Sequence, residues 1–191
     1  MYWVKTYLLF MLYSFIGWIY ETILCSVLKG EFVNRGFLHG PYCPIYGFGA
    51  ILIILLLTHY VQNALSLFVL SSVLATAFEY ASSYILEKLF NQRWWDYSNM
   101  RFNINGRVCL EGALIFGALS VLLVYYIHPL SMRLLEKASP LALKVIAVML
   151  FVVFATDVIV TVAHLLDIRR GIEEVQNLYN TFVEKVNIIR H

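Results

Sequence analysis

The fold of this chain is decided by the segment Phe32-Val-Asn-Arg-Gly-Phe-Leu-His-Gly-Pro-Tyr-Cys-Pro-Ile-Tyr-Gly-Phe-Gly49, which lies between two apolar stretches. Four glycines and two prolines within it predict a backbone that is neither a regular helix nor a strand. At membrane depth such backbone is stable only where it is buried in protein or lines a polar cavity, because unpaired N–H and C=O groups are costly in hydrocarbon. The segment is therefore the first candidate for a functional site.

Composition places the chain in a membrane. Hydrophobic residues make up 61% of the 191 residues and charged residues only 14%, and the mean hydropathy is +0.74. Too little polar surface remains to cover a soluble domain, so this class is excluded and the lipid bilayer is the predicted partner. The net charge of +2 does not indicate nucleic acid, because basic residues beside apolar spans normally set membrane topology.

Five apolar runs are long enough to cross a bilayer, which takes about 20 helical residues. The runs are 6–28, 42–61, 64–90, 108–128 and 141–166. They predict an all-α helical bundle at residues 1–166, with a short amphipathic piece, Leu130 to Ser139, lying at the interface between the fourth and fifth spans.

The last residues, 167–191, predict a separate amphipathic helix on the cytoplasmic side. Apolar side chains recur there at alternating spacings of four and three from Ile168 to Ile189, which gives one apolar seam. Three uses of this seam remain open: packing on the membrane domain or interface, pairing in a dimer, and docking of another protein.

The distribution of basic residues predicts the orientation. With five spans, four Lys and Arg residues lie on the side of the N-terminus and ten on the other side. The positive-inside rule then places the N-terminus outside and the two long loops and the C-terminus in the cytoplasm, as a multi-pass protein of the cell membrane.

No metal or cofactor is predicted. Cys25, Cys43 and Cys109 lack metal-ligand spacing and are expected to be free thiols. His39 lies in the irregular segment, but a single histidine with no second ligand does not indicate a metal site.

Two halves of the chain resemble each other in spacing. Glu21, Gly40-Pro-Tyr-Cys43 and Gly49-Ala50 of the first half correspond to Glu79, Gly106-Arg-Val-Cys109 and Gly117-Ala118 of the second. Since spans 1 and 3 run in the same direction, this pattern predicts a parallel repeat of spans 1–2 and 3–4 about an axis along the membrane normal.

Five carboxylates fall within the predicted spans: Glu21, Glu79, Glu87, Glu111 and Asp157. A charged carboxylate near the bilayer centre costs about 2.5 to 3.5 kcal/mol on insertion scales, so each needs a partner or a function. Several lie on polar stripes of helical period, which predicts a polar funnel open to the cytoplasm and roofed by the two long loops. In the simpler alternative, Glu and Arg pair and hold the bundle together. Glu79, the deepest, is the strongest candidate for proton coupling or acid–base work.

The predicted site joins these carboxylates to the loops. The candidate substrate-binding residues are Glu21, Asn34, Arg35, Glu79, Glu87, Trp95, Asp96, Asn103, Arg107 and Glu111. The candidate loop-backbone positions are Gly36, Gly40, Pro41, Pro44, Tyr46 and Gly47.

Motifs across residues 17–111 resemble a known family. They are Gly17-Trp18-x-x-Glu21, Asn34-Arg35-Gly36-Phe37-Leu38-x-Gly40-Pro41-x-x-Pro44-Ile45-Tyr46-Gly47-x-Gly49, Glu79-Tyr80, Trp94-Trp95-Asp96-Tyr97-Ser98 and Phe102-Asn103-Ile104-Asn105-Gly106-Arg107-Val108-Cys109. This pattern is similar to the CmpB-like bacterial membrane proteins that carry an ABC-transporter permease label, and to a small group of vertebrate transmembrane proteins. The resemblance implies a permease with partner subunits such as an ATPase, although the chain lacks the Glu-Ala-Ala-x-x-x-Gly loop by which many importer permeases grip their ATPase.

Three functions stay open from the sequence. The first is a permease that moves a small polar solute through a carboxylate-lined pocket, as a homodimer or with partner subunits. The second is a membrane enzyme in which Arg35, Arg93, Arg101 and Arg107 hold a lipid-linked phosphate and a carboxylate acts as base. The third is a non-catalytic assembly protein that docks a partner through its loops and tail.

Overall fold

A computed structural model describes the backbone of residues 1–58 and 63–189, with side chains described through Gly171 and at Asn177. The described chain is helical apart from its loops and one isolated bridge, between Ile104 and Val108. Its elements are α1 (Tyr2–Lys29), α2 (Pro44–Leu57), α3 (Ala64–Phe90), α4 (Leu110–Leu122), the π-helical turn η1 (Leu123–Ile127), α5 (His128–Lys137) and α6 (Pro140–Ile189). The prediction of an all-α bundle is confirmed.

Four helices are long and apolar enough to cross a membrane: α1, α3, the continuous run α4–η1–α5, and the first part of α6. The second predicted span, 42–61, does not correspond to any of these four helices. Its helix α2 covers 14 residues, about 21 Å at 1.5 Å per residue, which is shorter than a hydrocarbon core of about 30 Å. Helix α2 therefore does not cross the bilayer alone.

Local sequence explains where the helices begin and end. Helix α1 ends at Gly30 and α3 at Asn91, both in the left-handed conformation (φ 72° and 54°), with amides that bond back into the helix. The Asn63 side chain caps the start of α3 by accepting from the Ser66 amide. Pro44 starts α2, where its missing N–H is not needed.

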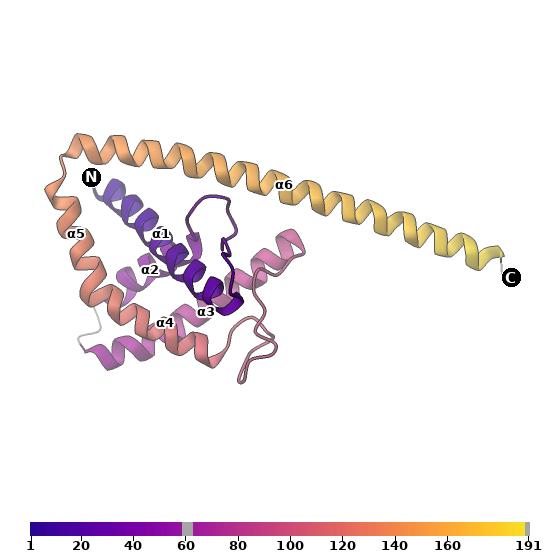
Figure 1. The fold of residues 1–191 in the computed structure, drawn as a ribbon, viewed down its shortest axis with the longest axis horizontal. Coiled ribbons are helices and arrows are strands. Elements are labelled where there is room, and N and C mark those ends of the chain that lie inside the picture. Colours follow the sequence, from indigo (N-terminus) through magenta and orange to yellow (C-terminus); the bar gives the residue numbers. More distant parts are fainter. Residues whose placement is uncertain (59–62, 190–191) are drawn as a thin grey trace.

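The loop after α1 turns back into the bundle. The Cys43 amide, just before α2, donates to the Ser14 carbonyl at 2.9 Å, and Ser14 lies about four helical turns before the end of α1. The loop thus runs back along α1, and α2 completes the return (Figure 1). The end of this loop therefore lies among the helices, and the expectation that the two loops roof a funnel stays a prediction.

The loop after α3 has the same plan. Tyr97 in this loop donates to Glu79, about three turns before the end of α3, and Cys109 is the N-cap of α4 as Cys43 is of α2. In both halves of the chain, a long helix is followed by an irregular loop that leads into a second helix, α2 or α4. This shared plan is what the predicted repeat requires.

Close helix contacts depend on glycine. Gly47 of α2 packs on Ser14 and the Phe10 carbonyl of α1, while Tyr46 packs on Gly17. Leu9, Tyr13, Ala50 and Leu123 then form the core where α1, α2 and η1 meet. These contacts fix α2 against the N-terminal half of α1.

The run α4–η1–α5 changes direction near the π-turn, so that α5 lies across the edge of the bundle near the N-terminus (Figure 1). The Tyr13 hydroxyl and the Nδ1 of His128 lie 2.8 Å apart at this bend. Helix α5 contains most of the predicted amphipathic piece, Leu130 to Ser139, but it continues α4 without a break instead of standing alone.

Helix α6 is one unbroken helix of 50 residues. The backbone therefore continues as a helix through residue 167, because no proline lies there and Gly171 is accommodated within the helix. The division of the chain at residue 167 into a membrane domain and a cytoplasmic helix stays a prediction. The C-terminal part of α6 extends away from the rest of the bundle (Figure 1). The predicted apolar seam falls largely outside the described side chains.

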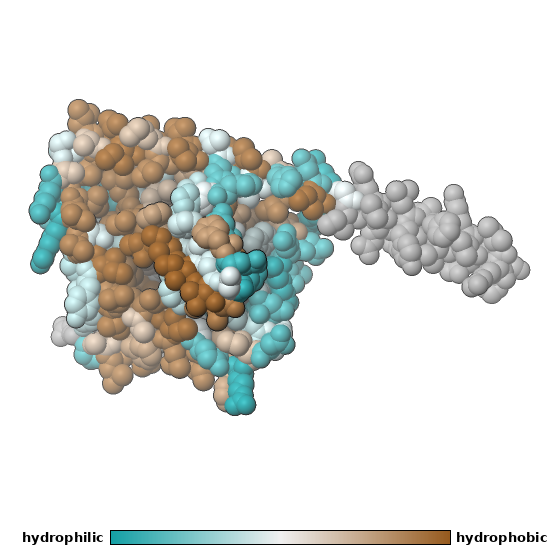
Figure 2. Space-filling view, in the orientation of Figure 1, coloured by the Kyte–Doolittle hydropathy of each residue, from teal (hydrophilic) through white to brown (hydrophobic). Residues whose placement is uncertain are grey.

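The surface agrees with a membrane-embedded bundle. Figure 2 shows apolar residues covering the helices, with hydrophilic residues at the edge near α5 and around the opposite, loop-bearing end. Most of the large side chains of α6 between Leu141 and Val160 are exposed, as expected for a surface that faces lipid or another protein.

Candidate functional site

The deepest predicted carboxylate, Glu79, lies in a central cluster with Glu21, Tyr46 and Tyr97. The side chain of Glu79 is 5% exposed, and its Oε1 accepts a hydrogen bond from the Tyr97 hydroxyl at 3.1 Å. Its Oε2 has no hydrogen-bond partner among the described residues. Glu21 and Tyr46 belong to the first half of the chain and Glu79 and Tyr97 to the second, and the halves meet where the ring centroids of Tyr46 and Phe116 lie 5.9 Å apart.

Glu21 is better paired than Glu79. It accepts a hydrogen bond of 2.5 Å from the Tyr46 hydroxyl and lies 3.8 Å from the Nε of Arg35. Next to this pair, the Trp18 indole donates to the Asn34 side chain at 2.8 Å. The structure thus brings together Glu21, Asn34, Arg35 and Tyr46 from the predicted set, at the side of the central cluster.

Asp157 of α6 holds the first loop in place. Its Oδ2 accepts from the Gly40 amide at 2.8 Å and from the Tyr42 hydroxyl at 2.7 Å, and its Oδ1 accepts from the His39 amide at 3.2 Å. The His39 Nδ1 lies 3.1 Å from the same oxygen and 2.8 Å from the Thr161 hydroxyl. The carboxylate therefore provides the acceptors for two loop amides and ties the first loop to α6.

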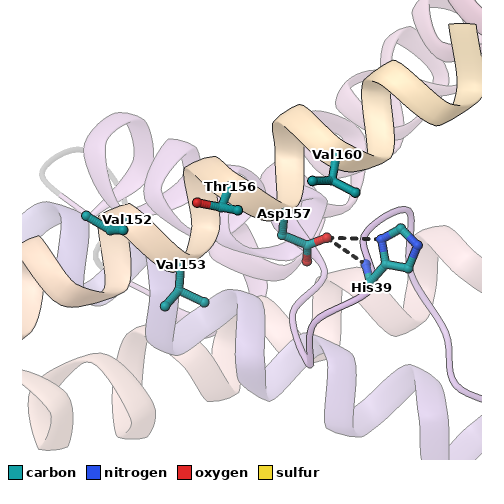
Figure 3. Close-up of a pocket in the computed structure, with 6 residues that line it drawn as sticks. All are labelled: His39, Val152, Val153, Thr156, Asp157 and Val160. Carbon is teal, nitrogen blue, oxygen red and sulfur yellow. Dashed lines mark hydrogen bonds and ion pairs between the residues drawn. The ribbon is translucent and has the colours of Figure 1, made fainter.

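Figure 3 shows the His39 ring turned toward Asp157 beside a shallow hollow on α6, which is lined also by Val152, Val153, Thr156 and Val160. Neither Asp157 nor His39 belonged to the predicted site set. The sequence does show polar residues four apart in the fifth predicted span, Asp157 and Thr161, and a Gly40-Pro41 dipeptide in the first loop. It contains no signal that these two segments contact each other, because His39 and Asp157 are 118 residues apart.

Glu87 belongs to an ion-pair network that fastens the second loop to α3. Its Oε2 contacts Arg93 Nε at 3.0 Å and Arg107 at 2.5 Å. Arg107 is 8% exposed, donates to Ser83 and lies over the rings of Tyr80 and Tyr84. With Arg35 also paired, three of the four arginines predicted to clamp a phosphate already have carboxylate partners, which weakens the enzyme alternative.

The other predicted residues of the second loop shape the loop itself. Asp96 accepts from the Ser98 hydroxyl and amide, which lowers the pKa of Asp96, and Asn103 donates to the Ser98 and Met100 carbonyls. The Trp95 indole donates to the Arg107 carbonyl at 3.0 Å. These contacts show that Trp95, Asp96 and Asn103 help to order the loop that carries Tyr97 of the central cluster.

The remaining predicted positions are spread along the chain. Glu111 is exposed in the first turn of α4, where a negative charge favours the helix N-terminus. Gly36 has a φ of 128°, a conformation that favours glycine, and a Cβ on Gly40 would lie 2.4 Å from the Tyr42 ring. Pro41 is exposed, whereas Pro44 and Gly47 begin α2. Gly36, Gly40 and Gly47 therefore permit close backbone packing.

No group of three or more His, Cys, Asp or Glu side chains among the described residues is arranged to hold a metal ion.

Comparison with known proteins identifies the family. No curated protein and no solved structure matches the chain. Residues 8–162 match one protein-family model, described as "Putative ABC-transporter type IV". This range covers most of the chain and includes both loops and the central cluster, so the protein is a multi-pass membrane protein that belongs to this transporter-type family.

Proposed function

We propose that the protein is a permease subunit that moves a small polar solute past the central cluster of Glu21, Tyr46, Glu79 and Tyr97. The main support for this proposal is that Glu79 is buried within a membrane bundle and that one of its carboxylate oxygens has no partner among the described residues. Ionisable groups in such places mark solute or ion pathways by default, because an idle one would only destabilise the bundle.

The path of the backbone supports the same proposal. Many transporters bind their solutes where helices are interrupted near the midplane, since free backbone ends and polar side chains can meet there. Here α2 and α4 both begin inside the bundle after an irregular loop, and Tyr46 and Tyr97 meet the two glutamates at this level.

A partner completes the proposed permease. Four long helices and a short one make a small bundle, and much of α6 is exposed along its apolar length. We infer that the working unit is a homodimer or includes further subunits such as an ATPase, in line with the name of the family.

Transport is tested by replacing Glu79. The purified protein is screened for thermal stabilisation by a panel of small polar solutes, and each stabilising solute is then supplied in radiolabelled form to proteoliposomes. We expect uptake above protein-free liposomes and a loss of at least about tenfold in Glu79→Gln, which removes one charged contact. Glu136→Gln, at an exposed position of α5 outside the predicted site, is the matched control and should retain uptake. Equal uptake by wild type and Glu79→Gln would contradict the proposed role.

We also propose that the N-terminus and α5 lie outside and that the two loops lie on the cytoplasmic side. A cysteine at Lys137, exposed on α5, should react with a membrane-impermeant maleimide on intact cells. A cysteine at Gln92, exposed in the second loop, should react only after permeabilisation. The wild type, with its three native cysteines, supplies the background, and the reverse labelling pattern would invert the topology.

A further inference from the structure

Glu79 is buried, and it differs from the half-buried carboxylates Glu21, Glu87 and Asp157 in lacking a basic neighbour. Glu21 pairs with Arg35, Glu87 with Arg93 and Arg107, and Asp157 with His39. For Glu79 no Lys, Arg or His nitrogen lies within 4.0 Å of the carboxylate in the described part of the chain. The side chain is nevertheless 5% exposed, so solvent does not balance its charge.

A second oxygen beside Glu79 is also unsatisfied. The hydroxyl of Thr76 is buried and has no hydrogen-bond partner among the described residues. Other buried hydroxyls in these helices donate to the carbonyl four residues earlier, as Ser72 does to Phe68 and Ser120 does to Phe116. Thr76 and Glu79 are three residues apart on α3, so both lie on one face of the helix.

Two further buried hydroxyls, of Tyr7 and Thr22, are unpaired in the described structure. Neither lies on the α3 face that bears Glu79, and neither accompanies a carboxylate oxygen without a partner. The pair formed by Thr76 and Glu79 is thus distinguished by a carboxyl oxygen that has neither a basic partner nor a hydrogen bond among the described residues.

We propose that Thr76 Oγ1 and Glu79 Oε2 bind one desolvated monovalent cation, with sodium as the first ion to test. Oxygen atoms are the ligands that such hard cations prefer, and the Tyr97 oxygen, 3.1 Å from Glu79 Oε1, can supply a further lone pair. One uncompensated negative charge matches one positive charge. A divalent ion such as Ca²⁺ takes about six to eight oxygen ligands, usually with several carboxylates, which this face does not offer.

The cation would occupy the same cluster as the solute of the proposed permease. Coupling between ion and solute rests on that proposed function, whereas ion binding does not. Binding without uptake would therefore contradict the permease alone, and uptake without ion binding would contradict the cation site alone.

The test uses the full-length protein in mild detergent. Its apparent unfolding temperature is followed by tryptophan fluorescence in sodium chloride, with N-methyl-D-glucamine chloride replacing sodium at constant ionic strength and pH. We expect a saturable rise on the order of 5 °C with sodium, because a ligand that binds only the folded state stabilises it. Potassium and lithium chloride give the order of ion preference.

Three variants decide the assignment. Glu79→Gln should abolish the sodium-dependent rise, and Thr76→Val, which has the same shape without the oxygen, should weaken the apparent sodium affinity by about tenfold. Ser72→Ala, whose hydroxyl is already bonded within α3, should behave as wild type. If Glu79→Gln does not elute as a folded protein, Thr76→Val against Ser72→Ala decides.

The proposal is overturned by equal unfolding temperatures in sodium and N-methyl-D-glucamine, or by a full sodium response in Thr76→Val. A stability that depends on pH but not on the cation would also overturn it, since it would show that a proton neutralises Glu79.

Discussion

An Asp157→Ala variant is expected to lose about 3 kcal/mol of stability, a fall of roughly 10 °C in the unfolding temperature. The Asp157 carboxylate accepts hydrogen bonds from the His39 and Gly40 amides and from the Tyr42 hydroxyl. Without it the two amides have no partner, and charged acceptors of this kind contribute more than neutral ones. Thermal unfolding of the detergent-purified protein measures the loss.

Two companion variants separate the hydrogen bonds of Asp157 from its size. Asp157→Asn keeps the shape but turns one acceptor into a donor facing other donors, so it should be almost as unstable as Asp157→Ala. Thr156→Val alters the neighbouring exposed side chain in the hollow and should leave stability unchanged. Wild-type stability of Asp157→Asn would mean that the loop is held by its packing on α1 instead.

A Gly47→Ala variant is expected to separate α1 from α2, whereas Gly49→Ala is expected to be neutral or slightly stabilising. A Cβ on Gly47 would lie 2.2 Å from the Ser14 hydroxyl oxygen and 2.7 Å from the Phe10 carbonyl oxygen, which belongs to backbone and cannot rotate away. A Cβ on Gly49 meets only Phe78, at 3.9 Å. Overpacking costs about 1 to 3 kcal/mol, whereas alanine is better than glycine in a helix interior by up to about 1 kcal/mol.

The comparison is made by thermal unfolding of both variants beside wild type. Gly47→Ala should unfold several degrees below wild type and Gly49→Ala at or slightly above it. Since both substitutions add one methyl group to the same short helix, helix propensity cancels between them. Equal unfolding temperatures would show that α2 shifts easily on α1, and that its close approach to Ser14 is not required.

The sequence predicted the helices well where apolar length decided them. The expected third span, 64–90, coincides with α3, and the fourth, 108–128, with α4 and η1. The second, 42–61, begins two residues before α2, and its end falls on residues 59–61, which lie outside the described structure. Hydropathy records burial of side chains but not whether the backbone is helical, so an irregular segment that enters the bundle at Cys43 is indistinguishable from the start of a span.

Only some contacts of the candidate site could be anticipated from the sequence. Local spacing drew attention to Glu21 and Arg35, which lie 3.8 Å apart, and the depth of Glu79 in its span marked that residue as unusual. The contact between His39 and Asp157 joins a loop to the last helix, and no local periodicity reports such a contact. Trp95, Asp96 and Asn103 were included because their types suit binding, but turn-forming side chains use the same polar atoms to order their own loop.

The contact between the Gly40 amide and Asp157 also has a consequence for biosynthesis. The two residues are 117 positions apart, so at about 5 to 20 residues per second the ribosome adds Asp157 roughly 6 to 23 s after Gly40. During this interval the first loop lacks the acceptor that lets its backbone remain among the helices. The Gly40 amide of the nascent chain must therefore bond to water or to the insertion machinery until α6 has been synthesised and supplies Asp157.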